Sequence, residues 1–94
     1  MFTYVALIKL TPEGRESLKE APEYLDKIKF FVEEQKGKLV TTFAMMGPWD
    51  FFAIVEYPTV EAAFKAHAKV ATLEVIEVET FPVEEVELFI KALA

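Results

Sequence analysis

The sequence predicts a single α+β domain over residues 1–94, with elements in the order β-α-β-β-α-β-α, which is a ferredoxin-like arrangement. Its 94 residues and 53% hydrophobic content suit one compact domain. Four stretches rich in β-branched and aromatic residues alternate with stretches of helical periodicity. A Gly-Pro-Trp turn separates the two middle strand stretches, which indicates a hairpin and therefore an antiparallel four-stranded sheet.

The N-terminal third is expected to hold one strand and two helical segments. The strand covers Phe2–Leu10 and ends before Pro12, which suits the first turn of a helix because its ring fixes φ. A short helix is predicted over 12–19, and a longer one begins near Pro22. Gly37 follows the last polar turn of that helix and is predicted to end it in the left-handed conformation.

The remaining residues are expected to form three strands and two helices. Strands over 38–46 and 50–57 flank the Gly-Pro-Trp turn. A helix begins near Thr59, a fourth strand covers 73–81, and a final helix follows Pro82. One face of this final helix is apolar, made of Val86, Phe89, Ile90 and Leu93.

Two strands carry apolar residues on both faces. Val5 and Leu7 alternate with the equally apolar Ala6 and Ile8, and Phe52 and Ile54 of the third strand repeat the pattern. Right-handed crossovers place both helices on one face of such a sheet, so the other face needs a separate cover. A second copy packed face to face by two-fold symmetry is the simplest cover. The pattern therefore predicts a homodimer.

Composition excludes several classes of function. The net charge is −6 and the basic residues are scattered, so no nucleic-acid partner is expected. The chain lacks cysteine, which rules out disulfides and cysteine-based zinc sites. The N-terminal residues fit neither a signal peptide nor a membrane span, so the protein is expected to be cytoplasmic, with no membrane partner. Asparagine is absent and Gln35 is the only glutamine, a bias that resembles thermophile usage.

Several stretches resemble the GYD-domain family. They are YVALIKLTPEG, the EAP before the long helix, GKLVTTFAMMGPWDFFAIVE and TLEVIEVETF, and the resemblance runs from about residue 3 to about residue 82. The family is named after a Gly-x-Tyr-Asp motif between its second and third strands, which here reads Gly47-Pro48-Trp49-Asp50 with tryptophan in place of tyrosine. The resemblance implies a dimeric α/β-barrel built of two ferredoxin-like sheets. It implies no established activity, and no cofactor is expected.

The motif itself has two interpretations. Gly47-Pro48 is a turn former, and Asp50 is expected to accept hydrogen bonds from turn N–H groups. The large ring of Trp49 needs a surface to cover. It either packs, at one end of the barrel or on the partner subunit, or it forms the wall of a ligand pocket.

His67 is the only histidine and the side chain best suited to titrate near neutral pH. It lies on the apolar stripe of its predicted helix, where a histidine is usually a core residue hydrogen-bonded to a carbonyl. The alternative is a polar group in a ligand pocket. A metal site is not expected, because the chain has no cysteine and no glutamate follows His67 at the third or fourth position.

A polar set on the second sheet face is a further candidate. Lys9 of the first strand and Glu77 and Glu79 of the fourth share that face, and the two strands are neighbours in this fold. The three side chains would line a partly polar ligand cavity inside the barrel. Alternatively, the two glutamates protect an edge strand from further pairing.

Two classes of function follow. The first is a small homo-oligomeric module that binds an apolar or amphipathic small molecule. The alternative is a cofactor-independent oxygenase or isomerase acting on an aromatic or enolic substrate, in which Tyr4, Tyr57, His67 or the charged set moves a proton. A purely structural oligomer would have no cavity. No catalytic residue is identifiable, because the sequence holds no recognisable nucleophilic triad, phosphate-binding loop or paired-carboxylate motif.

Overall fold

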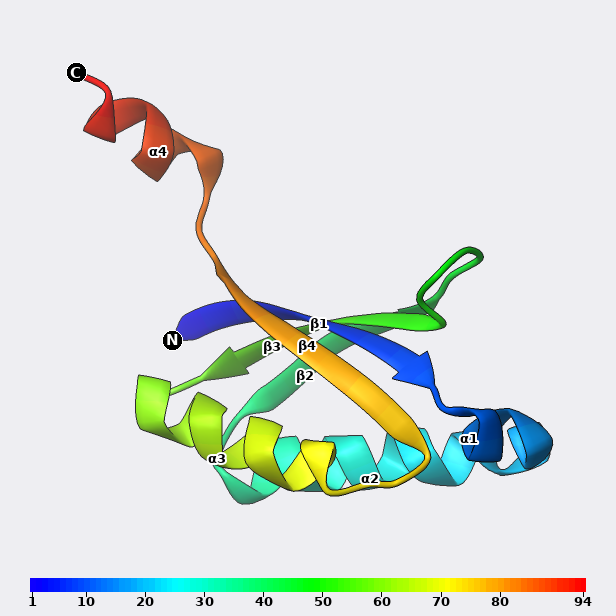
Figure 1. Ribbon diagram of the computed structural model, residues 1–94. Coiled ribbons are helices and arrows are strands. Elements are labelled where there is room, and N and C mark those ends of the chain that lie inside the picture. Colours follow the sequence, from blue (N-terminus) through cyan, green and yellow to red (C-terminus); the bar gives the residue numbers. More distant parts are fainter.

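A computed structural model describes residues 1–94 and has the predicted order of elements (Figure 1). The helix expected over 12–19 is divided into a five-residue α-helix and a short 3-10 helix, labelled η1. The elements are β1 (Phe2–Leu10), α1 (Pro12–Glu16), η1 (Leu18–Glu20), α2 (Ala21–Glu34), β2 (Lys38–Ala44), β3 (Phe51–Tyr57), α3 (Val60–Ala71), β4 (Ile76–Val83) and α4 (Val86–Ala92).

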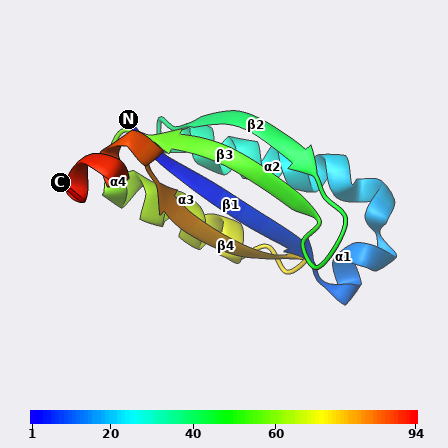
Figure 2. The same cartoon turned by 90° about the horizontal axis from the view of Figure 1, so that it is seen from above.

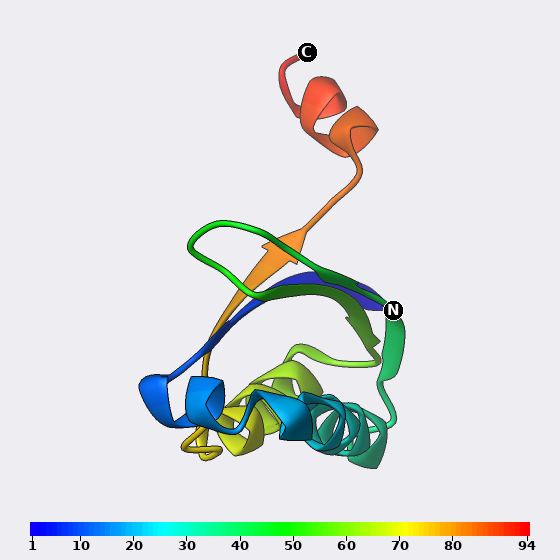
Figure 3. The same cartoon turned by 90° about the vertical axis from the view of Figure 1, so that its right-hand side faces the viewer.

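The four strands form one antiparallel sheet in the order β2-β3-β1-β4, so β2 and β4 are its edges. Helices α2 and α3 lie side by side under one face of the sheet, as Figures 1 and 3 show. Seen from above in Figure 2, the opposite face has no helix across it, and we call it the open face. The predicted α+β, ferredoxin-like fold is confirmed.

The core lies between the sheet and the two helices. Ile8, only 1% exposed, sits near its centre. The residues of β1 and β3 whose side chains point to the same face as Ile8 are buried as well. Helix α3 contributes the small side chains of Ala62, Ala63 and Ala66, which allow its backbone to approach the sheet closely. The other core residues are Tyr4, Ala6, Leu10, Tyr24, Ile28, Val32, Ala53, Val55, Tyr57, Val70 and Ile76.

The open face is apolar across its middle and charged toward its ends. Strand register places Ile54, Val5 and Phe81 in one row. The next row holds Phe43, Phe52 and Leu7 and ends at Glu79 on β4. The rings of Phe43 and Phe52 stack with centroids 5.7 Å apart. The two flanking rows carry the charges of Lys38 and Glu56 at one end and of Lys9 and Glu77 at the other.

The end of α2 differs from the prediction by one residue. Lys36, not Gly37, adopts the left-handed conformation, with φ of 59°. The Gly37 N–H donates to the Val32 carbonyl at 3.0 Å, which completes a Schellman motif. Gly37 is needed for space instead, since a Cβ there would lie 2.7 Å from the Tyr57 ring.

The C-terminal boundary also differs from the prediction. Strand β4 begins at Ile76 because the preceding turn is tied to Thr11, whose N–H donates to the Val75 carbonyl at 3.0 Å. Pro82 continues the strand instead of starting a helix, which is tolerated because β4 is an edge strand. Helix α4 starts only at Val86 and projects away from the body of the domain, on the side of the open face (Figures 1 and 3). None of the helices is long and apolar enough to cross a membrane.

Candidate functional site

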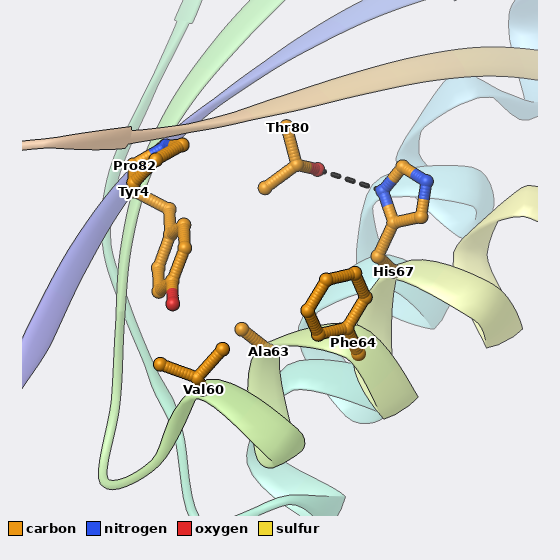
Figure 4. Close-up of a pocket in the computed structure, with 7 residues that line it drawn as sticks. All are labelled: Tyr4, Val60, Ala63, Phe64, His67, Thr80 and Pro82. Carbon is orange, nitrogen blue, oxygen red and sulfur yellow. Dashed lines mark hydrogen bonds between the residues drawn. The ribbon is translucent and has the colours of Figure 1, made fainter.

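A cavity of about 350 Å³ lies on the helix-covered side of the sheet, between α3 and the strands β1 and β4 (Figure 4). We call it the His67 pocket. Helix α3 supplies one wall and the two strands supply the other. Its lining residues are Tyr4, Val60, Ala63, Phe64, His67, Thr80 and Pro82.

The polar end of the pocket is a hydrogen-bonded pair. Nδ1 of His67, from α3, lies 2.8 Å from Oγ1 of Thr80, from β4, and Figure 4 shows the two side chains turned toward one another. His67 is half-buried, and its partner is this hydroxyl, not the backbone carbonyl expected for a core histidine. A hydroxyl has one donor and two acceptor sites, so Thr80 can bond His67 and still bond a ligand.

The rest of the pocket is largely apolar. The rings of Tyr4 and Phe64 face it from opposite walls, with Val60 and Pro82 at the same end as Tyr4 (Figure 4). Phe64 is 72% exposed, so it lies at the mouth and not in the core. The Tyr4 hydroxyl reaches the pocket and is a second polar group there. An apolar body with a few convergent polar groups is the usual composition of a small-molecule site.

Tyr57 is a neighbour of Tyr4 but does not line the pocket. The two rings meet edge to face with centroids 5.8 Å apart. Burial, with a smaller contribution from the neighbouring Tyr4, raises the pKa of Tyr57 to about 12. Tyr57 therefore remains a neutral phenol at physiological pH and is unsuited to act as a base there.

The raised pKa predicts how stability changes at alkaline pH. Because the folded chain holds the Tyr57 proton more tightly than the unfolded chain, this group's contribution to stability is fully present below pH 10 and is lost as pH rises toward 12. Tyr57→Phe is expected to remove part of this alkaline loss. Urea midpoints measured from pH 8 to pH 11.5 test it, and equal alkaline losses in both proteins would contradict it.

The sheet separates the predicted charged set from His67. Lys9 is directly opposite Glu77 across the β1–β4 pair, and Glu79 is opposite Leu7, so the three charges share one end of the open face. His67 lies on the other side of the sheet. The six predicted site residues therefore do not form a single site. The structure contains no cluster of three His, Asp or Glu side chains arranged to hold a metal ion.

The Trp49-Asp50 pair belongs to the loop between β2 and β3, which rises on the open-face side of the sheet (Figure 3). Trp49 is half-buried. The Asp50 carbonyl accepts from the Met45 N–H at 2.8 Å and closes the loop. Its side chain bonds outside the turn: Oδ2 accepts from the Leu10 N–H at 2.8 Å and from Nη2 of Arg15 at 3.1 Å. Asp50 thus fastens the hairpin to the end of β1 and to α1. This pair, too, lies apart from the His67 pocket, which neither residue lines.

Sequence reasoning missed Thr80, Phe64 and Pro82. The sequence did contain a usable signal. Residues 76, 78, 80 and 82 of the edge strand β4 all face the helices, and Thr80 is the one polar side chain among them. A lone polar residue facing the same space as a lone histidine indicates a pair. The register that brings the two together comes only from the structure.

Comparison with known proteins agrees with this architecture. A protein of Thermus thermophilus named glutamine synthetase and cystathionine beta-lyase binding protein is 30% identical over 89 residues, covering 90% of this chain and 94% of the relative. The solved structure of TTHA0845 from Thermus thermophilus superposes with a TM-score of 0.59 at 20% identity, over 90% of this chain and 95% of that one.

MtbAldR gives a TM-score of 0.68 at 10% identity over 89% of this chain, which spans only 52% of that protein, and both structural likenesses show the fold alone. The GYD domain family itself matches residues 4–93, as the motifs around Trp49 predicted. The chain therefore belongs to the GYD domain family.

Proposed function

We propose that the protein is a cytoplasmic, homodimeric binding module that holds a small apolar or amphipathic molecule in the His67 pocket. The observation that carries this proposal is the pocket itself. Its 350 Å³ are within the range of small-molecule sites, and a mostly apolar lining ends in the His67–Thr80 pair. A ligand with an aromatic or short aliphatic body and one hydroxyl or carboxylate group fits this composition.

The homodimer is supported by the open face. Its two middle rows are apolar except for Thr41 and Glu79 on the edge strands, and its flanking rows carry both signs of charge, a pattern that a two-fold copy of the face can match. Phe43 and Phe81 are about half exposed in the single chain. Aromatic rings left in water on the face of a sheet favour association.

The Thermus thermophilus relative supports a binding role. By its name, that protein binds glutamine synthetase and cystathionine beta-lyase. For this chain, a metabolic enzyme would be a further partner of the homodimer, outside the His67 pocket. The alternative of a cofactor-independent oxygenase or isomerase would require a pocket side chain, such as His67 or Tyr4, to move a proton of the ligand. Because Nδ1 of His67 is hydrogen-bonded to Thr80, Nε2 would be the ring nitrogen that exchanges this proton.

The single histidine makes the pocket directly observable. The ring protons of His67 give isolated proton NMR signals, and we expect indole, 4-hydroxybenzoate or octanoate to shift them with sub-millimolar affinity. Thr80→Val keeps the shape of the side chain and removes the hydroxyl, so it is expected to weaken binding about 2- to 10-fold, the value of one hydrogen bond.

Two phenylalanines provide a matched control. Phe64 lines the pocket and Phe30 of α2 does not, although both are largely exposed, at 72% and 60%. Phe64→Ala should weaken binding of the same probe, and Phe30→Ala should leave it unchanged. Absence of any His67 shift at several millimolar probe, or equal effects of the two variants, would overturn the pocket proposal. Turnover of a bound probe would favour the enzyme alternative.

A further inference from the structure

Helix α4 is apolar and has no packing partner in its own chain. All its residues are exposed, and none belongs to the core. A seven-residue helix is too short to be stable in water without a surface to pack on. Its apolar side chains at helical spacing are Val86, Phe89, Ile90 and Leu93, with Leu88 beside them.

The position of α4 restricts what that surface is. The last paired residue of β4 is Val83, opposite Thr3 on the open face, and only Glu84 and Glu85 separate it from the helix. Figures 1 and 3 show α4 standing clear of the sheet on the open-face side. A hollow of about 630 Å³ lies where α4 leaves the sheet, with Met1 and Thr3 on the sheet side and Leu88 and Lys91 on the helix side.

The reach of the segment matches the spacing of stacked sheets. Two extended residues span about 7 Å, and a sheet packed on the open face would lie about 10 Å away. Seven helical residues add about 10 Å of length. Helix α4 is therefore long enough to reach a second sheet packed on the open face and the side of the helices that cover that sheet.

We propose that α4 is an arm that packs against a second copy of this chain, so that the two copies of the homodimer clasp each other. The inference rests on the proposed homodimer and adds to it a second, separate contact. Phe81 and Val83 of the open face precede the arm closely in the chain, with only Glu84 and Glu85 between them and the helix. By two-fold symmetry, α4 of each copy would contact the same surface of the other copy.

Charge and area favour a second copy over a membrane. Glu84 and Glu85 come directly before α4, and Glu87 lies within it, whereas Lys91 is the single positive charge of this segment. The whole chain has a net charge of −6. Anionic lipid surfaces attract basic helices, not acidic ones. The exposed apolar side chains of one arm amount to on the order of 500 Å², so two arms add roughly 1,000 Å² toward the 1,200–2,000 Å² typical of a stable interface. The family match also extends through residue 93 and so includes the arm.

Phe89 and Phe30 test the proposal as a matched pair. They are 64% and 60% exposed, on α4 and on α2. Phe89→Asp is expected to raise the dimer dissociation constant at least about 10-fold in sedimentation equilibrium. Phe30→Asp should leave it unchanged. Because α4 does not pack on its own domain, far-UV circular dichroism of the Phe89→Asp protein should remain that of a folded chain.

A cross-link identifies the contact. The chain has no cysteine, so Phe89→Cys places a single thiol on the arm, to which a photoreactive benzophenone maleimide can be attached. In an equal mixture of nitrogen-15-labelled and unlabelled chains, the adducts are expected to join one chain to the other. A dimer with adducts only within one chain, or a Phe89→Asp protein as dimeric as the unchanged one, would overturn the arm. If a charge placed on the open face, as in Ile54→Lys, still dissociates the dimer in that case, the proposed homodimer is retained and only the arm is rejected. If the unchanged protein is monomeric, both the homodimer and the arm are rejected.

Discussion

Ile54→Lys is expected to convert the dimer into a folded monomer. Ile54 lies in the middle of the open face, on the central strand β3, between Thr41 and Val5 in register. A lysine there would be buried between two sheets without a counter-ion, and two-fold symmetry introduces two such charges per dimer. We expect the dissociation constant to rise at least about 1,000-fold, equivalent to about 4 kcal/mol.

Size-exclusion chromatography with light scattering measures this change. Leu18→Lys is the control, because Leu18 lies in η1, outside the open face, and is also exposed. That variant should remain dimeric. An Ile54→Lys protein that stays dimeric at low micromolar concentration would show that the copies associate through another surface.

The second large effect is expected from neighbouring residues on opposite faces of β1. Ile8 is buried against the helices, whereas Leu7 faces the open side. Ile8→Ala leaves a cavity in the core, so it should lower the free energy of unfolding by about 2–5 kcal/mol at any protein concentration. Leu7→Ala should lower the free energy of unfolding mainly at protein concentrations at which the dimer is populated, because the contacts of Leu7 are with the second copy.

Urea denaturation at about 1 and 100 μM protein separates the two effects. The midpoint shift caused by Ile8→Ala should be similar at both concentrations. The shift caused by Leu7→Ala should shrink on dilution to 1 μM, where the weakened dimer of the variant dissociates while the unchanged protein remains dimeric. Equal concentration dependence of the two variants would contradict the assignment of the two faces.

The elements that follow alternation or periodicity could be predicted from the sequence. Strand β1 has the predicted bounds because apolar alternation and the helix-starting Pro12 act at the same boundary. The two errors at element ends arise from tertiary contacts. Gly37 is required by the nearby Tyr57 ring and not by its φ, and Pro82 remains in a strand because β4 is at the edge of the sheet.

The candidate site was only partly predictable. Periodicity placed His67 on the apolar stripe of α3, but its partner Thr80 is 13 residues away and is brought to it by the register of β4. The alternation of strand residues correctly grouped Lys9 with Glu77 and Glu79 on one face. It did not reveal that the whole sheet separates this group from His67, because that depends on which face the helices cover.

Sedimentation equilibrium of the unchanged protein from about 1 to 100 μM tests the homodimer most directly. We expect a mass twice the 10.7 kDa of the chain throughout the range down to low micromolar concentration, since the open faces should bury well over 1,000 Å² between them. A folded species of 10.7 kDa over the same range would contradict it.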